Sequence, residues 1–336
     1  MPCSKLSIGP ETIDNRVVLA PMSGVTDIVF RRIAVRLGTG LAVSEMVASR
    51  ELASGDQEAR LRAEGAGMKL HVVQLAGREA ASMAEAAKVA EASGANIIDI
   101  NMGCPVKKVT GGHSGSALMR DLDHALTLIE ATVGAANVPV TLKMRLGWDH
   151  ASIVAPELAR RAQDAGVKLV TVHGRTRQQF YTGKADWNAI RAVKDAVSIP
   201  LIANGDLVRV EDAPAMLAAS GADAVMIGRG AQGRPWFPGQ VARFLETGEM
   251  VPDPDLATQH TIAREHYDGL LTLYGRETGL RHARKHLGWY LDEAARSTGQ
   301  IVDAEAKTAV LTADTPEDAR MKLAAAYDAL AWKAAA

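Results

Sequence analysis

Residues 70–105 read LHVVQLAGREAASMAEAAKVAEASGANIIDINMGCP, and this stretch decides the expected fold class. Two short apolar runs, residues 70–77 and 96–105, each end at a glycine or proline, as buried strands do. Residues 79–95 between them are rich in alanine and glutamate and have the apolar spacing of a helix. Strand, helix and strand in this order predict two parallel strands joined by a helical crossover.

The same unit recurs along the chain. Six further runs, apolar and often β-branched, lie at residues 16–22, 41–46, 139–145, 169–175, 200–206 and 224–229. Eight strands alternating with helices predict an α/β protein, a (β/α)8 TIM barrel, whose usual length is roughly 250 residues. A doubly wound open sheet is the alternative. It is less favoured, because no G-x-G-x-x-G turn follows the first run.

The pattern changes near residue 245. Residues 250–257, MVPDPDLA, are typical of a proline-containing linker, and residues 258–335 show only helical periodicity. We therefore expect a barrel domain over residues 1–245 and a C-terminal all-helical domain over residues 246–336. The second domain should contain about four helices.

Composition excludes several classes of protein. The 336 residues carry a net charge of −1, so any surface that binds nucleic acid must be local. The two cysteines, Cys3 and Cys104, cannot form a disulfide framework or a cysteine-rich zinc site, and no metal is expected. The start of the sequence does not resemble a signal peptide, and no apolar run approaches the roughly 18–20 residues that span a bilayer. We expect a cytoplasmic protein without membrane contact.

Polar groups mark the ends of nearly all predicted strands, where TIM barrels carry their chemistry. They are Glu45, Gln74, Asn101, Cys104, Lys143, Arg145, His173, Arg175, Asn204, Asp206 and Arg229. One such residue often only satisfies loop backbone, but a full ring of them predicts a binding or active site. The last two strands end in ANGD (203–206) and IGRG (227–230), and barrels often bind phosphate beside these two loops.

Lys143 shares one face of its strand with Thr141 and Arg145, by the alternation of residues 139–145. A lysine directed into a barrel is costly to bury unless an anionic group meets it. Two functional interpretations follow: a cation beside an electron-rich cofactor ring, or the Schiff-base lysine of an aldolase. A solvated lysine at the barrel mouth is the non-functional alternative.

Cys104 lies between Gly103 and Pro105, and the proline biases it toward extended backbone. The thiol should therefore lie at the mouth of the fourth strand, ahead of the glycine-rich loop 110–116. An ordinary thiol is mostly protonated at neutral pH, which suits a proton donor better than a nucleophile. A buried structural cysteine is the alternative.

Several longer motifs contain these strand-end residues. The chain contains LAPMSGVTD (19–27), DINMGCPVKKV (99–109), VTLKMRLGW (140–148), VTVHGRTR (170–177), IPLIANGD (199–206) and RHARKHLGWYL (281–291). Together they resemble the tRNA-dihydrouridine synthases, and most closely the bacterial B-type branch. The likeness extends from about residue 8 to past residue 290.

The resemblance implies an FMN-dependent reductase in which NADPH reduces the flavin. The flavin then passes hydride to C6 of a tRNA uridine, and a cysteine protonates C5 to leave 5,6-dihydrouridine. By motif, that cysteine is Cys104. The implied FMN contacts are Pro21, Met22, Ser23, Gln74, Lys143, His173, Asn204, Gly205, Asp206, Gly228 and Arg229.

A tRNA substrate requires a basic surface. The predicted contacts at the barrel mouth are Asn101, Lys107, Lys108, Arg145, Arg175 and Arg177. In the helical domain Arg281, Arg284 and Lys285 share one helical side, and Trp289 and Tyr290 are close enough in sequence to stack on RNA. We expect His113 to be a loop histidine in water, with a second acid near the base as the alternative.

Three other functions remain open from the residues. One is an FMN barrel that acts on a small pyrimidine or enone. Another is a Schiff-base aldolase or phosphate-sugar lyase that uses Lys143. The last is a non-catalytic tRNA-binding factor.

Overall fold

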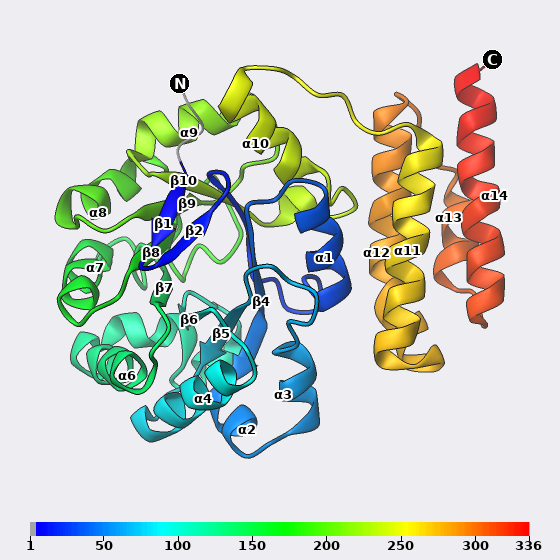
Figure 1. Ribbon diagram of the computed structural model, residues 1–336. Coiled ribbons are helices and arrows are strands. Elements are labelled where there is room, and N and C mark those ends of the chain that lie inside the picture. The colour runs from blue at the N-terminus through cyan, green and yellow to red at the C-terminus, as the bar shows by residue number, and fades with distance from the viewer. Residues whose placement is uncertain (1–4, 336) are drawn as a thin grey trace. The chain divides into compact units, whose positions relative to one another are not determined.

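The computed structural model describes residues 5–335, and its first part is a closed barrel of eight parallel strands (Figure 1). The strands are β3 (Val17–Leu19), β4 (Leu41–Ala48), β5 (Val72–Ala76), β6 (Ile97–Met102), β7 (Val140–Arg145), β8 (Leu169–His173), β9 (Leu201–Asn204) and β10 (Ala224–Ile227). Each pairs with the next in sequence, and β10 pairs with β3 through Val225 opposite Val17. The predicted TIM barrel is therefore confirmed.

Helices connect the barrel strands and surround them (Figure 1). They are α1 (Ile28–Arg36), α2 (Ser49–Ala53), α3 (Gln57–Arg62), α4 (Ala80–Ala92), α5 (Lys107–Thr110), α6 (Leu122–Ala135), α7 (Ala155–Asp164), α8 (Arg191–Ala196), α9 (Asp212–Ser220) and α10 (Phe237–Thr247). In α4 the buried residues Met83, Ala86, Ala87 and Ala90 form one apolar side. The strands that α4 connects, β5 and β6, are buried along their whole length, as strands beneath helices are.

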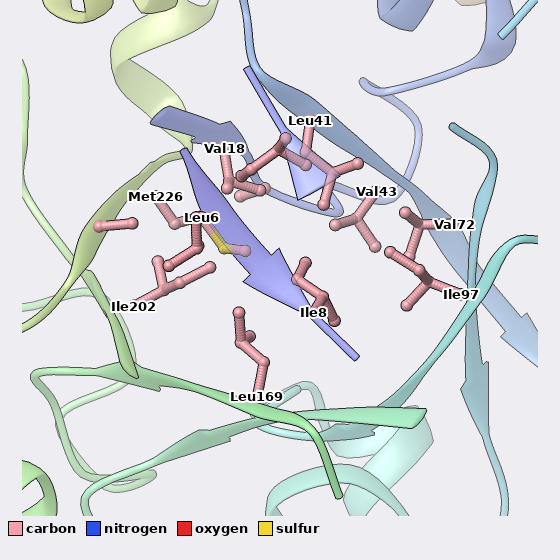
Figure 2. Close-up of a cluster of buried hydrophobic side chains, with 13 residues drawn as sticks. Leu6, Ile8, Val18, Leu41, Val43, Val72, Ile97, Leu169, Ile202 and Met226 are labelled. Carbon is pink, nitrogen blue, oxygen red and sulfur yellow. The ribbon is translucent and has the colours of Figure 1, made fainter. Parts of the chain in front are cut away.

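An antiparallel hairpin that the sequence pattern does not predict precedes the barrel. Its strands β1 (Leu6–Ile8) and β2 (Glu11–Ile13) pair with Leu6 opposite Ile13. Leu6, Ile8 and Ile13 belong to a buried apolar cluster (Figure 2). Its other members are Val18, Ala20, Leu41, Val43, Val72, Ile97, Leu169, Ile202, Ala224 and Met226. Several of these are the first residues of barrel strands, so the hairpin covers the amino-terminal end of the barrel.

The described chain divides into two compact units. The barrel unit extends to Gly230 and includes Pro238–Glu249, and the helical unit consists of Ala231–Phe237 and the residues from Met250 onward. The functional division between residues 245 and 246 stays a prediction. No described helix has the length and apolarity that crossing a membrane requires. Cys3 lies outside the described residues.

The helical unit contains the four helices that the periodicity predicted. They are α11 (Leu256–Tyr274), α12 (Arg276–Ser297), α13 (Ala304–Leu311) and α14 (Pro316–Ala335). Helix α12 packs against the other three, and the buried side chains of Tyr267, Tyr290 and Tyr327 contribute to the core of the unit. The Tyr267 hydroxyl donates a hydrogen bond to the Pro316 carbonyl at 3.0 Å, which connects α11 to the start of α14.

Truncating the hairpin core should destabilise the barrel. Ile13 is fully buried, and Ile13→Ala should lower the free energy of unfolding by about 2–5 kcal/mol, because it removes apolar contacts and leaves a cavity. Urea unfolding followed by circular dichroism measures this. Thr12→Ala is the matched control, because Thr12 is exposed in the same strand. Equal stability of the two variants would contradict a structural role for the hairpin.

Candidate active site

The predicted cofactor residues, except Gln74 inside the barrel, lie at the barrel rim, meaning the carboxyl-terminal ends of the strands and the loops that follow them. Pro21, Met22 and Ser23 follow β3, Gln74 lies in β5, Lys143 in β7, His173 ends β8, Asn204 ends β9 ahead of Gly205 and Asp206, and Gly228 and Arg229 follow β10. Ser23 and Arg229 are exposed, whereas Gln74, His173 and Asn204 are buried. Their assignment to FMN stays a prediction at this point.

Lys143 is half-buried in β7 and donates a hydrogen bond to Asn204 Oδ1 at 3.2 Å. Burial lowers the pKa of Lys143 to about 8, and the Arg145 guanidinium acts in the same direction while Asp99 opposes it. Within residues 5–335 the ammonium group has no second hydrogen-bond acceptor. Two of its N–H groups can therefore meet an electron-rich or anionic ligand.

His173 is a neutral histidine at the end of β8. Burial is the main cause that holds the pKa of His173 well below its usual range. The cations that act in the same direction are Lys143, Arg145, Arg175 and Arg229. Arg175 Nη1 lies 3.2 Å from His173 Nε2, and a guanidinium can only donate. Nε2 therefore accepts, which leaves the ring proton on Nδ1.

Asp206 organises the loop after β9 and has a left-handed φ of 55°. Its two carboxylate oxygens accept from Arg175 at 2.9 and 2.6 Å, and the Ala185 N–H donates to Oδ2 at 2.7 Å. Arg229 Nη2 lies 3.4 Å from Oδ1. Partial burial raises the pKa of Asp206, but these hydrogen bonds and the two cations outweigh burial and lower it. An ionised Asp206 thus holds Arg229 at the rim.

Two glycines at the rim occur for different structural reasons. Gly205 has a φ of 126°, and a Cβ there would lie 2.6 Å from Ala185 Cβ, so the loop itself requires glycine. At Gly228 no left-handed φ occurs, and a Cβ would meet Met22 Sδ at 3.6 Å and Ala20 Cβ at 3.8 Å, which are ordinary contacts. The fold does not require glycine at residue 228. Its bare backbone instead leaves space beside Met22.

Three side chains fix the Cys104 loop, residues 103–105. Asn101 Oδ1 accepts from the N–H groups of Cys104 at 3.0 Å and Gly103 at 3.3 Å. The Ser116 N–H and hydroxyl donate to the Cys104 carbonyl at 3.1 and 2.9 Å. Arg145 Nε donates to the Gly103 carbonyl at 2.8 Å. The backbone on both sides of the half-buried thiol is therefore held in place.

The barrel interior below this loop contains polar residues that the sequence analysis did not select as site residues. Asp99 accepts from the Thr141 hydroxyl and from Gln74 Nε2, both at 2.6 Å. Burial raises the pKa of Asp99, although these two hydrogen bonds and the Lys143 charge lower it. Asp99 shares a strand face with Asn101 by the two-residue period, and this signal could have identified it.

Two arginines predicted to contact tRNA are buried. Arg145, at 2% exposure, donates to the carbonyls of Thr176 and Phe180 as well as to Gly103. Arg175, at 1% exposure, is paired with Asp206. Both guanidinium groups hold loops of the rim together. Their contact with RNA stays a prediction.

Of the other predicted RNA contacts in the barrel unit, the two lysines are exposed and Arg177 is half-buried. Lys107 and Lys108 are exposed on α5. Arg177 stacks 4.7 Å from the Trp148 ring centroid, and Arg120, which the sequence analysis missed, lies 4.8 Å from it. Neither of these arginines forms an ion pair with a carboxylate of the described chain. Asn101, in contrast, is buried.

His113 is exposed in the glycine-rich loop with a left-handed φ of 59°, as expected of a loop histidine in water.

In the helical unit, Arg281, Arg284 and Lys285 are all exposed on α12, as their spacing predicted. Tyr290 is buried, and its hydroxyl lies 3.1 Å from His266 Nδ1. The expectation that Tyr290 stacks on RNA is therefore wrong, because the ring packs inside the unit.

Comparison with known proteins identifies the family of this chain. The family model described as dihydrouridine synthase (Dus) matches residues 18–322. The chain belongs to the dihydrouridine synthase family. A probable tRNA-dihydrouridine synthase of Rhizobium leguminosarum bv. phaseoli is 58% identical over 318 residues, which cover 95% of this chain and 97% of the relative. The tRNA-dihydrouridine synthase B of Xanthomonas axonopodis pv. citri is 48% identical over 327 residues, covering 97% and 96%.

These matches confirm the resemblance to dihydrouridine synthases, including the B-type branch, and the prediction of an enzyme. Solved structures share the fold. Morphinone reductase in complex with tetrahydroNAD aligns with a TM-score of 0.50 and 14% identity over 76% of this chain and 93% of its own. An old yellow enzyme homologue from Zymomonas mobilis aligns with a TM-score of 0.51 and 16% identity over 76% and 95%. Family membership leaves the aldolase and non-catalytic alternatives without support.

The buried charge of Lys143 predicts a pH-dependent stability. Its pKa is about 8 in the folded chain and ordinarily about 10.5, so between these values unfolding takes up a proton. The free energy of unfolding of the flavin-free parent should therefore rise with pH in this window, relative to Lys143→Met. Near neutral pH the variant should be the more stable, because it buries no charge. Urea unfolding at several pH values measures both effects.

Lys108→Met is the control for this measurement, since Lys108 is exposed. Parallel pH profiles for the parent and Lys143→Met would contradict the lowered pKa.

Proposed function

We propose that the protein reduces specific uridines of tRNA to 5,6-dihydrouridine, with FMN bound at the barrel rim and NADPH as the reductant. The observation that carries the proposal is the Cys104 loop, fixed on both sides at the same rim as Lys143, neutral His173 and the bare Gly228 backbone. The relatives named tRNA-dihydrouridine synthase support tRNA as the substrate. Residues 1–245 would carry the reaction, and residues 246–336 would bind tRNA.

The rim residues fit the two electron-rich parts of FMN. The Lys143 N–H groups without a protein acceptor suit the ring edge where negative charge gathers on reduction. The phosphate suits the space beside Gly228 and the guanidinium of Arg229, which Asp206 orients. When bound and reduced by NADPH, FMN supplies the hydride that uracil C6 needs.

Cys104 would supply the proton. One hydride at C6 and one proton at C5 convert the C5–C6 double bond of uracil to a single bond, which balances the reaction. The thiol that loses its proton becomes a thiolate, and solvent returns the proton afterwards. Lys143 and Arg145 interact electrostatically with Cys104. Their positive charges would stabilise the thiolate at the moment of transfer.

RNA phosphates would bind the basic surface of each unit. In the barrel unit Lys107, Lys108 and the Arg120–Arg177 pair on Trp148 have no carboxylate partner among residues 5–335. Because the net charge of the chain is only −1, this surface is a local one. A uridine of folded tRNA must also leave its stack to reach the rim.

Replacing Cys104 by alanine should abolish turnover and preserve the first half-reaction. Cys104→Ala should bind FMN and accept electrons from NADPH at the parent rate, since the proposal gives the thiol no part in FMN binding or in flavin reduction. Reoxidation by tRNA lacking dihydrouridine should slow by about 100- to 10,000-fold, because a positioned general acid is lost. Anaerobic single-turnover absorbance at the flavin band measures the rate, and mass spectrometry of the tRNA measures dihydrouridine.

Cys104→Ser separates acid chemistry from packing, since the hydroxyl keeps the size but is a far weaker acid and should rescue little. Parent-like reoxidation in Cys104→Ala would overturn the acid role. A parent protein that forms no dihydrouridine in tRNA would overturn the proposed function itself.

The helical unit gives a second test. Changing Arg281, Arg284 and Lys285 to alanine should raise the KM for tRNA and reduce its salt dependence, because fewer counterions are released on binding. Oxidation of NADPH by oxygen should not change, because it requires no RNA. Replacing the exposed Arg160, Lys168 and Arg209 of the barrel unit instead is the charge-matched control. Equal loss in both half-reactions would indicate a folding defect and contradict RNA contact.

A further inference from the structure

A chain of buried hydrogen bonds extends from the barrel interior to the Cys104 loop. The strand register places Gln74 opposite Asp99 and Asp99 opposite Thr141, so these side chains form one row across β5, β6 and β7. Their exposures are 0%, 4% and 4%. Asn101, two residues further along β6, connects the row to Cys104.

Each bond of the chain is well formed. Asp99 Oδ1 accepts from the Thr141 hydroxyl and Oδ2 from Gln74 Nε2, both at 2.6 Å. Gln74 Oε1 accepts from Asn101 Nδ2 at 2.8 Å. Asn101 Oδ1 then accepts from the Cys104 N–H at 3.0 Å.

The Asp99 carboxylate sets the donor-to-acceptor direction of these hydrogen bonds. An ionised carboxylate can only accept, whereas a side-chain amide has one donor end and one acceptor end. Asp99 therefore requires Gln74 to turn its NH2 toward Asp99 and its oxygen toward Asn101. The same rule turns the Asn101 NH2 toward Gln74 and leaves the Asn101 oxygen for Cys104. The N–H groups of Gly103 and Cys104 can only donate, so the far end of the row requires the same direction, and Asp99 supplies the acceptor that lets Gln74 keep it.

We infer that Asp99 is a positioning residue, which sets the orientation of Gln74 and Asn101 and thereby holds Cys104 in its reactive place. We call Asp99, Gln74 and Asn101 the amide relay. This inference rests on the proposed role of Cys104 as the proton donor.

Other contacts of the loop do not replace the amide relay. Ser116 and Arg145 hold carbonyl oxygens of the loop, whereas Asn101 holds its N–H groups. The only side-chain acceptor for the N–H groups of residues 103 and 104, within the described chain, is therefore one that the amide relay orients. Burial raises the pKa of Asp99, and the hydrogen bonds from Thr141 and Gln74 and the charge of Lys143 on the neighbouring strand oppose this rise and favour the ionised form on which the amide relay depends.

Three nearly isosteric variants test the inference. Thr141→Val removes one donor to Asp99 and leaves the carboxylate, so the amide relay keeps its direction. In Asp99→Asn the Thr141 hydroxyl can rotate to accept from the new amide, so the direction can persist. In the double variant valine accepts nothing, and the new N–H can donate only to Gln74. Either this N–H stays buried without an acceptor, or Gln74 and Asn101 turn over and place the Asn101 NH2 against the Cys104 N–H. Both outcomes leave buried donors unpaired and disturb the hydrogen bonds that hold Cys104.

Two measurements read the outcome. Hydrogen exchange of the Cys104 amide, without tRNA, reports the bond to Asn101. Single-turnover flavin reoxidation by tRNA in the FMN-bound enzyme reports the proton transfer. In Thr141→Val both the exchange rate of the Cys104 amide and the rate of flavin reoxidation should stay within about twofold of the parent. In the double variant the exchange should be faster, and the reoxidation slower, by about tenfold or more than the product of the two single effects predicts. Flavin reduction by NADPH should be equal in Asp99→Asn and the double variant, since both lose the same charge.

The inference is overturned if the double variant exchanges the Cys104 amide and reoxidises its flavin as Asp99→Asn does. If the double variant does not fold, Asp99→Leu decides: it leaves the Gln74 NH2 without its acceptor, so its Cys104 amide must exchange faster than that of Thr141→Val, and equal exchange overturns the inference. Failure of the proposed function would appear separately, as a parent enzyme that forms no dihydrouridine while the exchange differences remain.

Discussion

The parallel pairing of β10 with β3 closes the barrel, and the positions of all the rim groups depend on this closure. In a closed ring no strand has a free edge, and every inward side chain has neighbours on both sides. At the amino-terminal end the hairpin fills the interior with apolar side chains. At the carboxyl-terminal end the inward positions are polar, and buried polar groups must find hydrogen bonds. Neighbouring strands supply those partners, as in the row of Gln74, Asp99 and Thr141 on β5, β6 and β7.

The rim also carries an excess of positive charge. Four cations lower the pKa of His173, namely Lys143, Arg145, Arg175 and Arg229. Asp206 neutralises part of this charge through its ion pair with Arg175, and the charge of Asp99 raises the pKa of Lys143. Repulsion between partly buried cations is unfavourable, so an anionic or electron-rich ligand is the natural complement of this arrangement.

Much of this structure could be predicted from the sequence, because the barrel strands are short apolar runs with clear ends. The hairpin could not, because its strands have three residues each and too little pattern to detect. The ring of polar residues at the strand ends could also be predicted from the sequence. The burial of Arg175 was not, since its partner Asp206 lies 31 residues away and no local pattern shows which arginine will be paired. The burial of Tyr290 could have been read from the apolar positions 283, 287, 291 and 294 on the same helix.

The hairpin has a consequence for the order in which the chain can fold. Residues 6–13 are synthesised before any barrel strand, yet Leu6 and Ile8 belong to the cluster that also contains Ala224 and Met226. Their complete set of partners exists only after more than 200 further residues have left the ribosome. Contacts of such long range form slowly, because the intervening chain must be ordered first. An apolar segment made early thus keeps part of its surface exposed until the last strand closes the ring, and transiently exposed apolar surface of this kind promotes aggregation during folding.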